Sequence, residues 1–253
     1  MVTKTSITQS LKELGVKNGD VLLFHSSLKS FGFVSGGADA VIDGVLDAVL
    51  PNGTAVVPTL VQKNFNDAYK TWNKNTSPSD VGIITETFRL RKNALRSDQA
   101  THSVAAIGKH AKEITSTHVS STPRPHAYGE YAFSTGSPWQ KIYELDGKIL
   151  FMGVDLIVNT FRHFVEALYA EKIISLLDNS PKKDELLKLL VTHSTLEEHT
   201  PASRRKKRWK ETYTNKISIR KTDYRPKLSE SMRAQKSFLR KFAFHFNERA
   251  RLC

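Results

Sequence analysis

Two short apolar runs, one on each side of a helix-like segment, constrain the fold of this chain more than any other feature. Residues 21–24 are continuously apolar and residues 54–57 nearly so, which is typical of strands buried on both faces. Between them, residues 38–50 carry Val41, Val45 and further apolar residues at helical spacing. Strand, helix and strand at this spacing predict a β-α-β unit, and therefore a mixed α/β sandwich.

The same periodicity, with the turn residues between the periodic segments, predicts the other elements. The predicted helices span residues 5–16, 38–50, 82–90, 110–117, 138–147, 159–174, 184–191 and 228–251. The remaining predicted strands span 103–108, 148–153 and 212–220, and long polar loops are expected over 59–80 and 118–137.

Size and composition allow one ordinary folded core. The chain has 253 residues, of which 39% are hydrophobic, and this suffices for one sizeable core with or without an appended lobe. No run approaches the roughly 18 apolar residues of a membrane span, and the N-terminus lacks the apolar region of a secretory signal. Cys253 is the single cysteine, which excludes an intrachain disulfide and a cysteine-based metal cluster. These features predict a cytoplasmic protein.

The net charge of +13 is unevenly distributed. Residues 201–253 hold 17 Lys and Arg against 4 Asp and Glu, so the whole excess lies in this C-terminal segment, which opens with the basic run 204–210. Such a segment can be an arm that binds nucleic acid or another anionic partner, or the solvated surface of an ordinary lobe. Spaced apolar residues within the segment favour the second interpretation.

The first candidate site is a polar segment directly after the strand predicted at 21–24. It consists of Ser26, Ser27, Leu28, Lys29, Ser30 and Phe31. Ligands bind at the carboxyl ends of strands in open α/β sheets, and hydroxyls, backbone N–H groups and a lysine suit a phosphate-bearing ligand. The spacing matches neither a P-loop nor a dinucleotide-binding fingerprint, so a polar loop that caps the next helix remains an open interpretation.

The second candidate site lies at the entrance to the strand predicted at 103–108. Thr101, His102 and Ser103 precede Val104 and two alanines, and these small residues would allow a ligand to approach the backbone closely. His102 is a candidate acid or base. A histidine that only donates or accepts a structural hydrogen bond is the more common finding at such a position.

The third candidate site is the pair His163 and Glu166. The two residues are three positions apart in the helix predicted at 159–174, so their side chains emerge on one face. A carboxylate beside an imidazole fixes its tautomer and raises its basicity, and such a pair can take a proton from an amine. The same spacing also occurs by chance as a surface ion pair. No HExxH-like set is present, so no metal is expected.

The order of these sites resembles the motifs of the aminoglycoside 3-N-acetyltransferases. The resemblance spans about residues 5–172. It is carried by residues 24–32, 36–39, 53–59, 77–79, 96–97, 101–108, 136–138 and 150–153, with Gly82, Glu86, Thr160, His163 and Glu166.

This resemblance implies a single antibiotic N-acetyltransferase-type domain, a mixed sheet with helices on both faces. It implies transfer of an acetyl group from acetyl-CoA, as cosubstrate, to an amine of an aminoglycoside or amino sugar, an activity of the antibiotic-resistance type. Residues 26–31 would hold the pantetheine and pyrophosphate of CoA. Thr101 and Ser103, with Val104, would line the thioester end. His163 would act as the general base, oriented by Glu166.

Two segments depart from the family pattern. Gln99 and Ala100 stand where members of the family often carry His-Pro. Beyond residue 172 the resemblance is faint, and the chain divides into a predicted CoA-binding catalytic core, 1–176, and a divergent basic region, 177–253. A basic lobe beside the site would repel polycationic aminoglycosides. Two alternatives therefore stay open: an acyltransferase of the same fold that acts on a different amine, and a weakly catalytic core with a nucleic-acid-binding tail.

Overall fold

A computed structural model describes residues 1–61, 68, 70–124, 126, 128–129, 131–177 and 181–185 of the chain. The basic run 204–210 and the elements predicted at 212–220 and 228–251 lie outside these residues. The predicted C-terminal region, 177–253, is described only at its beginning. The helix predicted at 184–191 overlaps a helical segment, 181–185, and its remainder lies outside the described residues.

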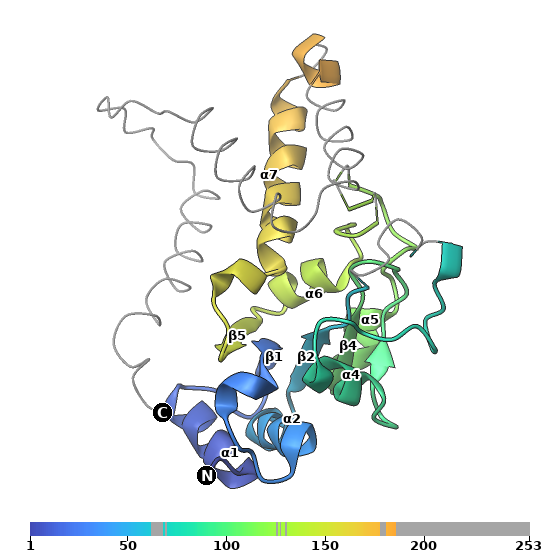
Figure 1. Cartoon of the computed structure of the whole chain (residues 1–253). Helices are drawn as coiled ribbons and strands as arrows, with labels where there is room; N and C mark the ends of the chain where they lie inside the picture. The colour runs from blue at the N-terminus through green and yellow to red at the C-terminus, as the bar shows by residue number, and fades with distance from the viewer. Residues whose placement is uncertain are drawn as a thin grey trace, which may run out of the picture. The chain divides into compact units, whose positions relative to one another are not determined.

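A mixed five-stranded sheet forms the centre of the fold (Figure 1). Its strands are β1 (Val21–Ser26), β2 (Thr54–Pro58), β3 (Leu95–Arg96), β4 (Val104–Gly108) and β5 (Lys148–Met152). In the order β3-β4-β2-β1-β5, strand β1 is parallel to both β2 and β5, whereas β4 is antiparallel to β2 and β3. The predicted β-α-β unit is thereby confirmed as β1-α2-β2.

Helices cover the sheet on both faces, as predicted. They are α1 (Lys4–Glu13), η1 (Leu28–Phe31), α2 (Gly37–Val49), α4 (Ile83–Arg89), α5 (Ala111–Thr115), α6 (Pro138–Glu144), η2 (Leu156–Val158) and α7 (Phe161–Leu176). Helices α2 and α4 pack on one face with α1 against α2, while α5 packs on β3 and β4 and contacts α6, which in turn contacts α7. In Figure 1, α1 and α2 lie side by side on one side of the sheet, and α6 and α7 on the other.

The core follows from the apolar runs that predicted the strands. Leu22 and Phe24 of β1 point into the cluster formed with α2, and the intervening Leu23 is equally buried on the opposite face. Both faces of the sheet are therefore shielded from water, which is why these strands are continuously apolar instead of alternating. Local signals set the helix ends: Ser137 caps α6, and Pro138 occupies its first turn.

Several local predictions were wrong, and the helices predicted to end at residues 117 and 147 end at Thr115 and Glu144. The polar segment after β1 contains the short 3-10 helix η1, and residues 68, 70 and 71 of the predicted loop 59–80 are helical. The first helix ends at Glu13, before residue 16, because the chain turns at Gly15 with a φ of +87° that glycine adopts without strain. None of the helices among the described residues is both long and apolar enough to cross a membrane.

Candidate active site

The three segments that the sequence singles out meet at one edge of the sheet. The parallel strands β1, β2 and β5 all end there, and β4 begins there. The backbone N–H of Ser27 donates to the carbonyl of Met152 at 3.1 Å, and that of Thr59 donates to the carbonyl of Ser103 at 2.9 Å. The topology therefore collects the residues after β1, before β4 and after β5 at the edge where α/β proteins bind ligands.

The segment after β1 is a tight turn built around hydroxyls. Ser30 Oγ donates to Ser27 Oγ at 3.1 Å, and Lys29 and Ser30 are exposed. Gly153, which follows β5, passes so close that a Cβ at this position would lie 2.5 Å from the Cβ of Ser30, so only glycine fits. The Ser26 hydroxyl is buried without a hydrogen-bond partner.

The segment before β4 is fully buried and densely hydrogen-bonded. Ser103 Oγ donates to the Thr59 carbonyl at 3.0 Å, and the Val104 N–H donates to Ser97 Oγ at 3.0 Å. Thr101 Oγ1 lies 2.9 Å from Nδ1 of His102. These residues are thus held rigidly at the sheet edge, with little freedom in their side chains.

Gln99, which departs from the family pattern, has a structural role in this turn. Its side chain is buried, and its Oε1 accepts hydrogen bonds from the backbone N–H groups of Thr101, at 2.9 Å, and of His102. The amide oxygen thereby satisfies two backbone donors that would otherwise be buried without partners. Gln99 thus fixes the backbone from which Thr101 and His102 project.

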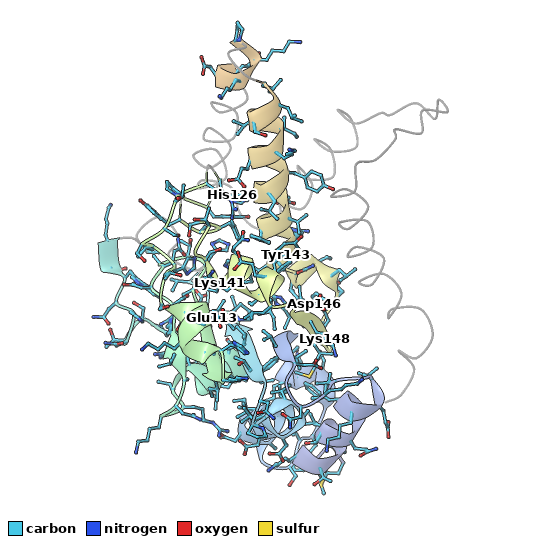
Figure 2. The ribbon with its side chains drawn as sticks, turned by 180° about the vertical axis from the view of Figure 1, so that it is seen from behind. Glu113, His126, Lys141, Tyr143, Asp146 and Lys148 are labelled. Atoms are coloured by element: carbon cyan, nitrogen blue, oxygen red, sulfur yellow. The ribbon has the colours of Figure 1, made fainter. Side chains whose placement is uncertain are left out.

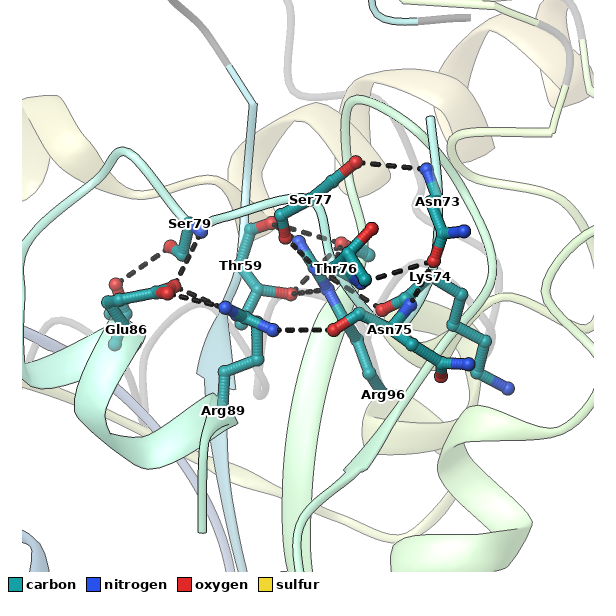
Figure 3. Close-up of polar contacts among 12 residues, drawn as sticks. Thr59, Asn73, Lys74, Asn75, Thr76, Ser77, Ser79, Glu86, Arg89 and Arg96 are labelled. Atoms are coloured by element: carbon teal, nitrogen blue, oxygen red, sulfur yellow. Dashed lines mark hydrogen bonds and ion pairs between the residues drawn. The ribbon is translucent and has the colours of Figure 1, made fainter. Parts of the chain in front are cut away.

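Arg96 fastens a long loop onto the same edge (Figure 3). Its guanidinium donates to the Thr59 carbonyl at 2.8 Å and to the carbonyl of Ser77, and it lies 4.4 Å from the ring centroid of Trp72. Burial lowers the pKa of Arg96 to about 10, which still leaves it charged at neutral pH. Three of its partners lie 19 or more positions away in the sequence, so their identity was not visible from local patterns.

The pair predicted as the general base is formed on α7. Nδ1 of His163 lies 2.7 Å from Oε2 of Glu166, and the imidazole is more deeply buried than the carboxylate. An ionised carboxylate only accepts hydrogen bonds, so Nδ1 carries the proton and the basic lone pair of the neutral ring is on Nε2. The pair thus presents one imidazole nitrogen of α7 as a hydrogen-bond acceptor.

Aromatic residues from the predicted loop 118–137 surround this histidine, and sequence reasoning missed them. The ring centroid of Tyr128 lies 5.0 Å from that of His163, and those of His126 and Phe133 lie at 6.1 and 6.3 Å. Figure 2 shows His126 beside α7. The concentration of His, Tyr and Phe within this loop was the signal that could have indicated a site.

The other histidines around His163 are neutral at neutral pH. Burial, together with the nearby positive charge of a protonated His163, lowers the pKa of His126 to about 3. The same two causes, burial first, lower the pKa of His102 well below its usual value. His126 and His102 therefore add no positive charge to this edge of the sheet near pH 7.

Residues 23–184 match the protein family described as aminoglycoside 3-N-acetyltransferase, and this range covers more than half of the chain. The chain belongs to the aminoglycoside 3-N-acetyltransferase family. Every site residue predicted from the sequence lies inside the matched range, and the basic run 204–210 lies beyond it. The candidate sites thus occupy the part of the chain that is shared with the family, while α1 precedes it.

Curated members of the aminoglycoside 3-N-acetyltransferase family align with about two thirds of the chain. The SPbeta prophage-derived aminoglycoside N(3')-acetyltransferase-like protein YokD of Bacillus subtilis is 34% identical over 184 residues, which are 65% of this chain and 64% of YokD. Aminoglycoside N(3)-acetyltransferase III of Salmonella is 33% identical over 66% of this chain and 61% of its own length. The chain thus spans less than two thirds of the length of these relatives.

Solved structures of the family share the fold. The crystal structure of YokD from Bacillus subtilis has a TM-score of 0.56 at 32% identity, covering 66% of this chain and 70% of YokD. AAC-IIIb in a binary complex with CoASH has a TM-score of 0.58 at 26% identity, covering 66% and 65%. A histidine-to-alanine variant of AAC(3)-IVa in complex with apramycin has a TM-score of 0.54 at 31% identity, covering 66% and 62%.

Proposed function

We propose that the protein transfers an acetyl group from acetyl-CoA to an amine of an aminoglycoside, with His163 as the general base. The observation that carries this proposal is the His163–Glu166 pair, joined at 2.7 Å on α7 within a chain of the aminoglycoside 3-N-acetyltransferase family. The complexes of related proteins with CoASH and with apramycin support the two substrates.

The chemistry requires one proton acceptor near neutral pH. An amine becomes a nucleophile only as the neutral species, and it loses a proton as it attacks the thioester carbon of acetyl-CoA. In the proposed step Nε2 of His163 takes that proton, the C–N bond forms, and the C–S bond breaks to release CoA. Glu166 stabilises the resulting imidazolium through its bond to Nδ1. No covalent acetyl-enzyme is needed.

The CoA molecule is assigned to the carboxyl edge of β1. Residues 26–31 offer hydroxyls and the charge of Lys29 to the pyrophosphate and pantetheine. Thr101, Ser103 and Val104 are assigned to the layer directly behind the thioester end, because they are buried and their hydrogen bonds to Gln99, Thr59 and Ser97 would keep the wall of the site rigid. A rigid wall is useful because a displacement of the reacting atoms by about 1 Å can lower the rate by about 100-fold.

The acceptor is assigned to the side of His163 that carries its aromatic neighbours. Tyr128 and His126 contact the His163 ring, and the half-buried carboxylate of Glu166 lies beside it. A negative carboxylate and aromatic ring faces attract the ammonium groups that an aminoglycoside carries. Both features favour an acceptor that carries further ammonium groups beside the amine that reacts.

A CoA-release assay tests the proposed reaction. Purified protein with acetyl-CoA should release free thiol when apramycin or gentamicin is added, and mass spectrometry should show one added acetyl group on the antibiotic. Acetyl-CoA alone measures background hydrolysis. The absence of acceptor-dependent release, in protein that binds acetyl-CoA by calorimetry, would remove the aminoglycoside from the proposal. A failure to bind acetyl-CoA would overturn the assigned function as a whole.

A further inference from the structure

A third potential metal ligand stands beside the proposed base pair. The ligand atoms of His126, His163 and Glu166 all lie within 4.8 Å of one another, and no other such group of three or more occurs among the residues that the structure describes. The sequence predicted no metal because His126 comes from a loop 37 positions before His163, and only the fold brings the two together. We propose that His126, His163 and Glu166 bind Zn²⁺ and that this ion inhibits the enzyme.

The donor set selects the class of metal. Two imidazoles and one carboxylate are the ligands of many zinc sites, whereas Mg²⁺ and Ca²⁺ prefer oxygen ligands alone. Three protein ligands leave the fourth tetrahedral position of Zn²⁺ open to water. His126 is held among aromatic rings, with its centroid 4.7 Å from that of Phe133, and this packing limits its movement away from α7.

The geometry needs only a small adjustment. Bonds of about 2.0–2.1 Å place tetrahedral ligand atoms roughly 3.3 Å apart, so the widest separation must close by no more than roughly 1.5 Å. Rotation of partly buried side chains can supply this movement.

Zinc would displace hydrogen bonds that exist in its absence. These are the 2.7 Å bond between His163 and Glu166 and a weak 3.3 Å bond from the Tyr128 N–H to Nδ1 of His126. When the ion binds Nδ1 of His163, the ring proton moves to Nε2, so the imidazole stays neutral but changes its tautomer. Both costs lower the affinity below that of a four-ligand structural site, and a dissociation constant on the order of micromolar is expected.

The inhibitory consequence rests on the proposed function. With Zn²⁺ on Nδ1 and the ring proton on Nε2, His163 has no lone pair left to accept the amine proton, and a Glu166 carboxylate that binds Zn²⁺ cannot stabilise an imidazolium. The ion and the acceptor amine therefore compete for the same imidazole. Zinc binding itself does not depend on the reaction, so it is measurable even if the acceptor has been wrongly assigned.

The direct test is calorimetric titration of the untagged full chain with Zn²⁺ alone. Cys253→Ser serves as the background, because the single thiol is another potential ligand. One equivalent of Zn²⁺ should bind, and Mg²⁺ should not. His126→Gln should weaken the affinity by at least about 10-fold, since the loss of even an outer-shell partner costs about 10- to 100-fold.

His110→Ala is the matched control. His110 and Glu113 have the same spacing, with Nδ1 and Oε2 at 2.8 Å. No third potential metal ligand lies beside them among the residues that the structure describes. This variant should bind zinc as the parent does. Glu166→Gln, in a different element from His126, provides a second test if His126→Gln does not fold. Co²⁺ absorption should report tetrahedral coordination in the parent chain and lose intensity in both site variants.

The outcomes separate the two proposals. Absence of stoichiometric zinc binding, or binding that both His126→Gln and Glu166→Gln leave unchanged, overturns the zinc site. Site-dependent binding together with acetyl transfer that falls as zinc is added, and recovers with EDTA, supports it in full. Site-dependent binding in a protein without acetyl transfer supports the zinc site and overturns the proposed function. Transfer that zinc leaves unchanged, in a chain saturated with zinc, overturns the inhibitory role.

Discussion

His110 with Glu113 at the start of α5, and His163 with Glu166 on α7, are two pairs with the same spacing in sequence and nearly the same geometry. The Nδ1–Oε2 distances are 2.8 and 2.7 Å. The side chains of the first pair are 26% and 50% exposed, and those of the second 11% and 35%. The spacing and the hydrogen bond are thus shared, and burial is the first property that separates the two pairs.

Position on the sheet is the second difference. The backbone N–H of His110 donates to Oγ1 of Thr54, the first residue of β2, so this pair lies at the amino end of that strand. His163 belongs to the helix that follows the carboxyl end of β5, and it contacts His126, Tyr128 and Phe133. Ligands of α/β sheets bind at the carboxyl ends. The two His–Glu motifs are alike, so it is their surroundings that distinguish a candidate site from a surface pair.

Removing the imidazole should separate the two pairs most strongly. His163→Ala is expected to lower kcat for acetyl transfer by about 10³-fold, within the range that general bases supply, while acetyl-CoA binding stays nearly unchanged. His110→Ala is expected to leave kcat within about 2-fold, because an exposed ion pair contributes little to the fold. The CoA-release assay measures kcat, and calorimetry measures acetyl-CoA affinity. Equal kcat values in the two variants would contradict the assignment of the base.

Neutralising the carboxylate should give a smaller difference of the same sign. Glu166→Gln keeps the size of the side chain but removes the charge that stabilises the His163 imidazolium, and kcat is expected to fall by about 100-fold. Glu113→Gln is the matched variant and should behave as the parent chain. The pH dependence of kcat distinguishes the loss of the Glu166 charge from a structural effect. A change in the tautomer of His163 and in the charge beside it is expected to shift the pH profile of kcat. A drop in kcat without any shift of the profile would indicate a structural role alone.

Two arginines extend the comparison from function to stability. The buried guanidinium of Arg124 donates to Glu171 on α7 at 2.9 Å, to the Phe133 carbonyl at 3.2 Å and to Gln140 on α6 at 2.9 Å. Arg91, by contrast, pairs with the more exposed Asp39 and Asp43 on α2.

Arg124→Ala is expected to lower the free energy of unfolding by about 2–3 kcal/mol, since it leaves a buried carbonyl without its donor. Arg91→Ala should cost about 1 kcal/mol or less. Urea unfolding at pH 7 measures both. Similar losses in the two variants would show that the loop and α7 are held together without Arg124.

Local patterns were sufficient to predict most of the fold. The apolar runs at 21–24 and 54–57 became β1 and β2 because both are buried on two faces, so continuous hydrophobicity was a physical requirement there. Strand β3 was missed because two residues are too few to show a periodic pattern, and its extended form depends on pairing with Ala105 and Ala106 of β4. Short elements of this kind are set by their partners and not by their own composition.

The candidate site could be predicted only in part. The His163–Glu166 contact is local, so helical spacing predicted it correctly. The same spacing gives His110–Glu113, so the spacing alone does not distinguish the two pairs. The contacts of His163 with His126 and Tyr128 span 37 and 35 positions. Such contacts arise only once the sheet and α6 have brought the loop against α7.

His25, unlike His110 and His163, is a buried histidine without a carboxylate partner. It is 5% exposed, stacks on Phe151 at 5.3 Å between ring centroids, and its Nε2 has no hydrogen-bond partner. Burial lowers its pKa to about 4. Between pH 6.5 and about 4, the unfolded chain binds a proton at His25 that the folded chain does not, so the free energy of unfolding falls as the pH falls through this window.

Replacing His25 with phenylalanine should remove this acid sensitivity. A pKa change from 6.5 to about 4 costs the folded state about 2 kcal/mol between pH 7 and pH 5, and His25→Phe should lose about that much less stability over the same interval. Urea unfolding of the parent and the variant at pH 7 and pH 5 measures the difference. His102, His118 and His126, whose pKa values are also lowered by burial, keep part of the acid sensitivity in both chains. Equal losses in the two chains would mean that the folded state accommodates a protonated His25, and that burial without a partner is less costly at the end of β1 than its surroundings indicate.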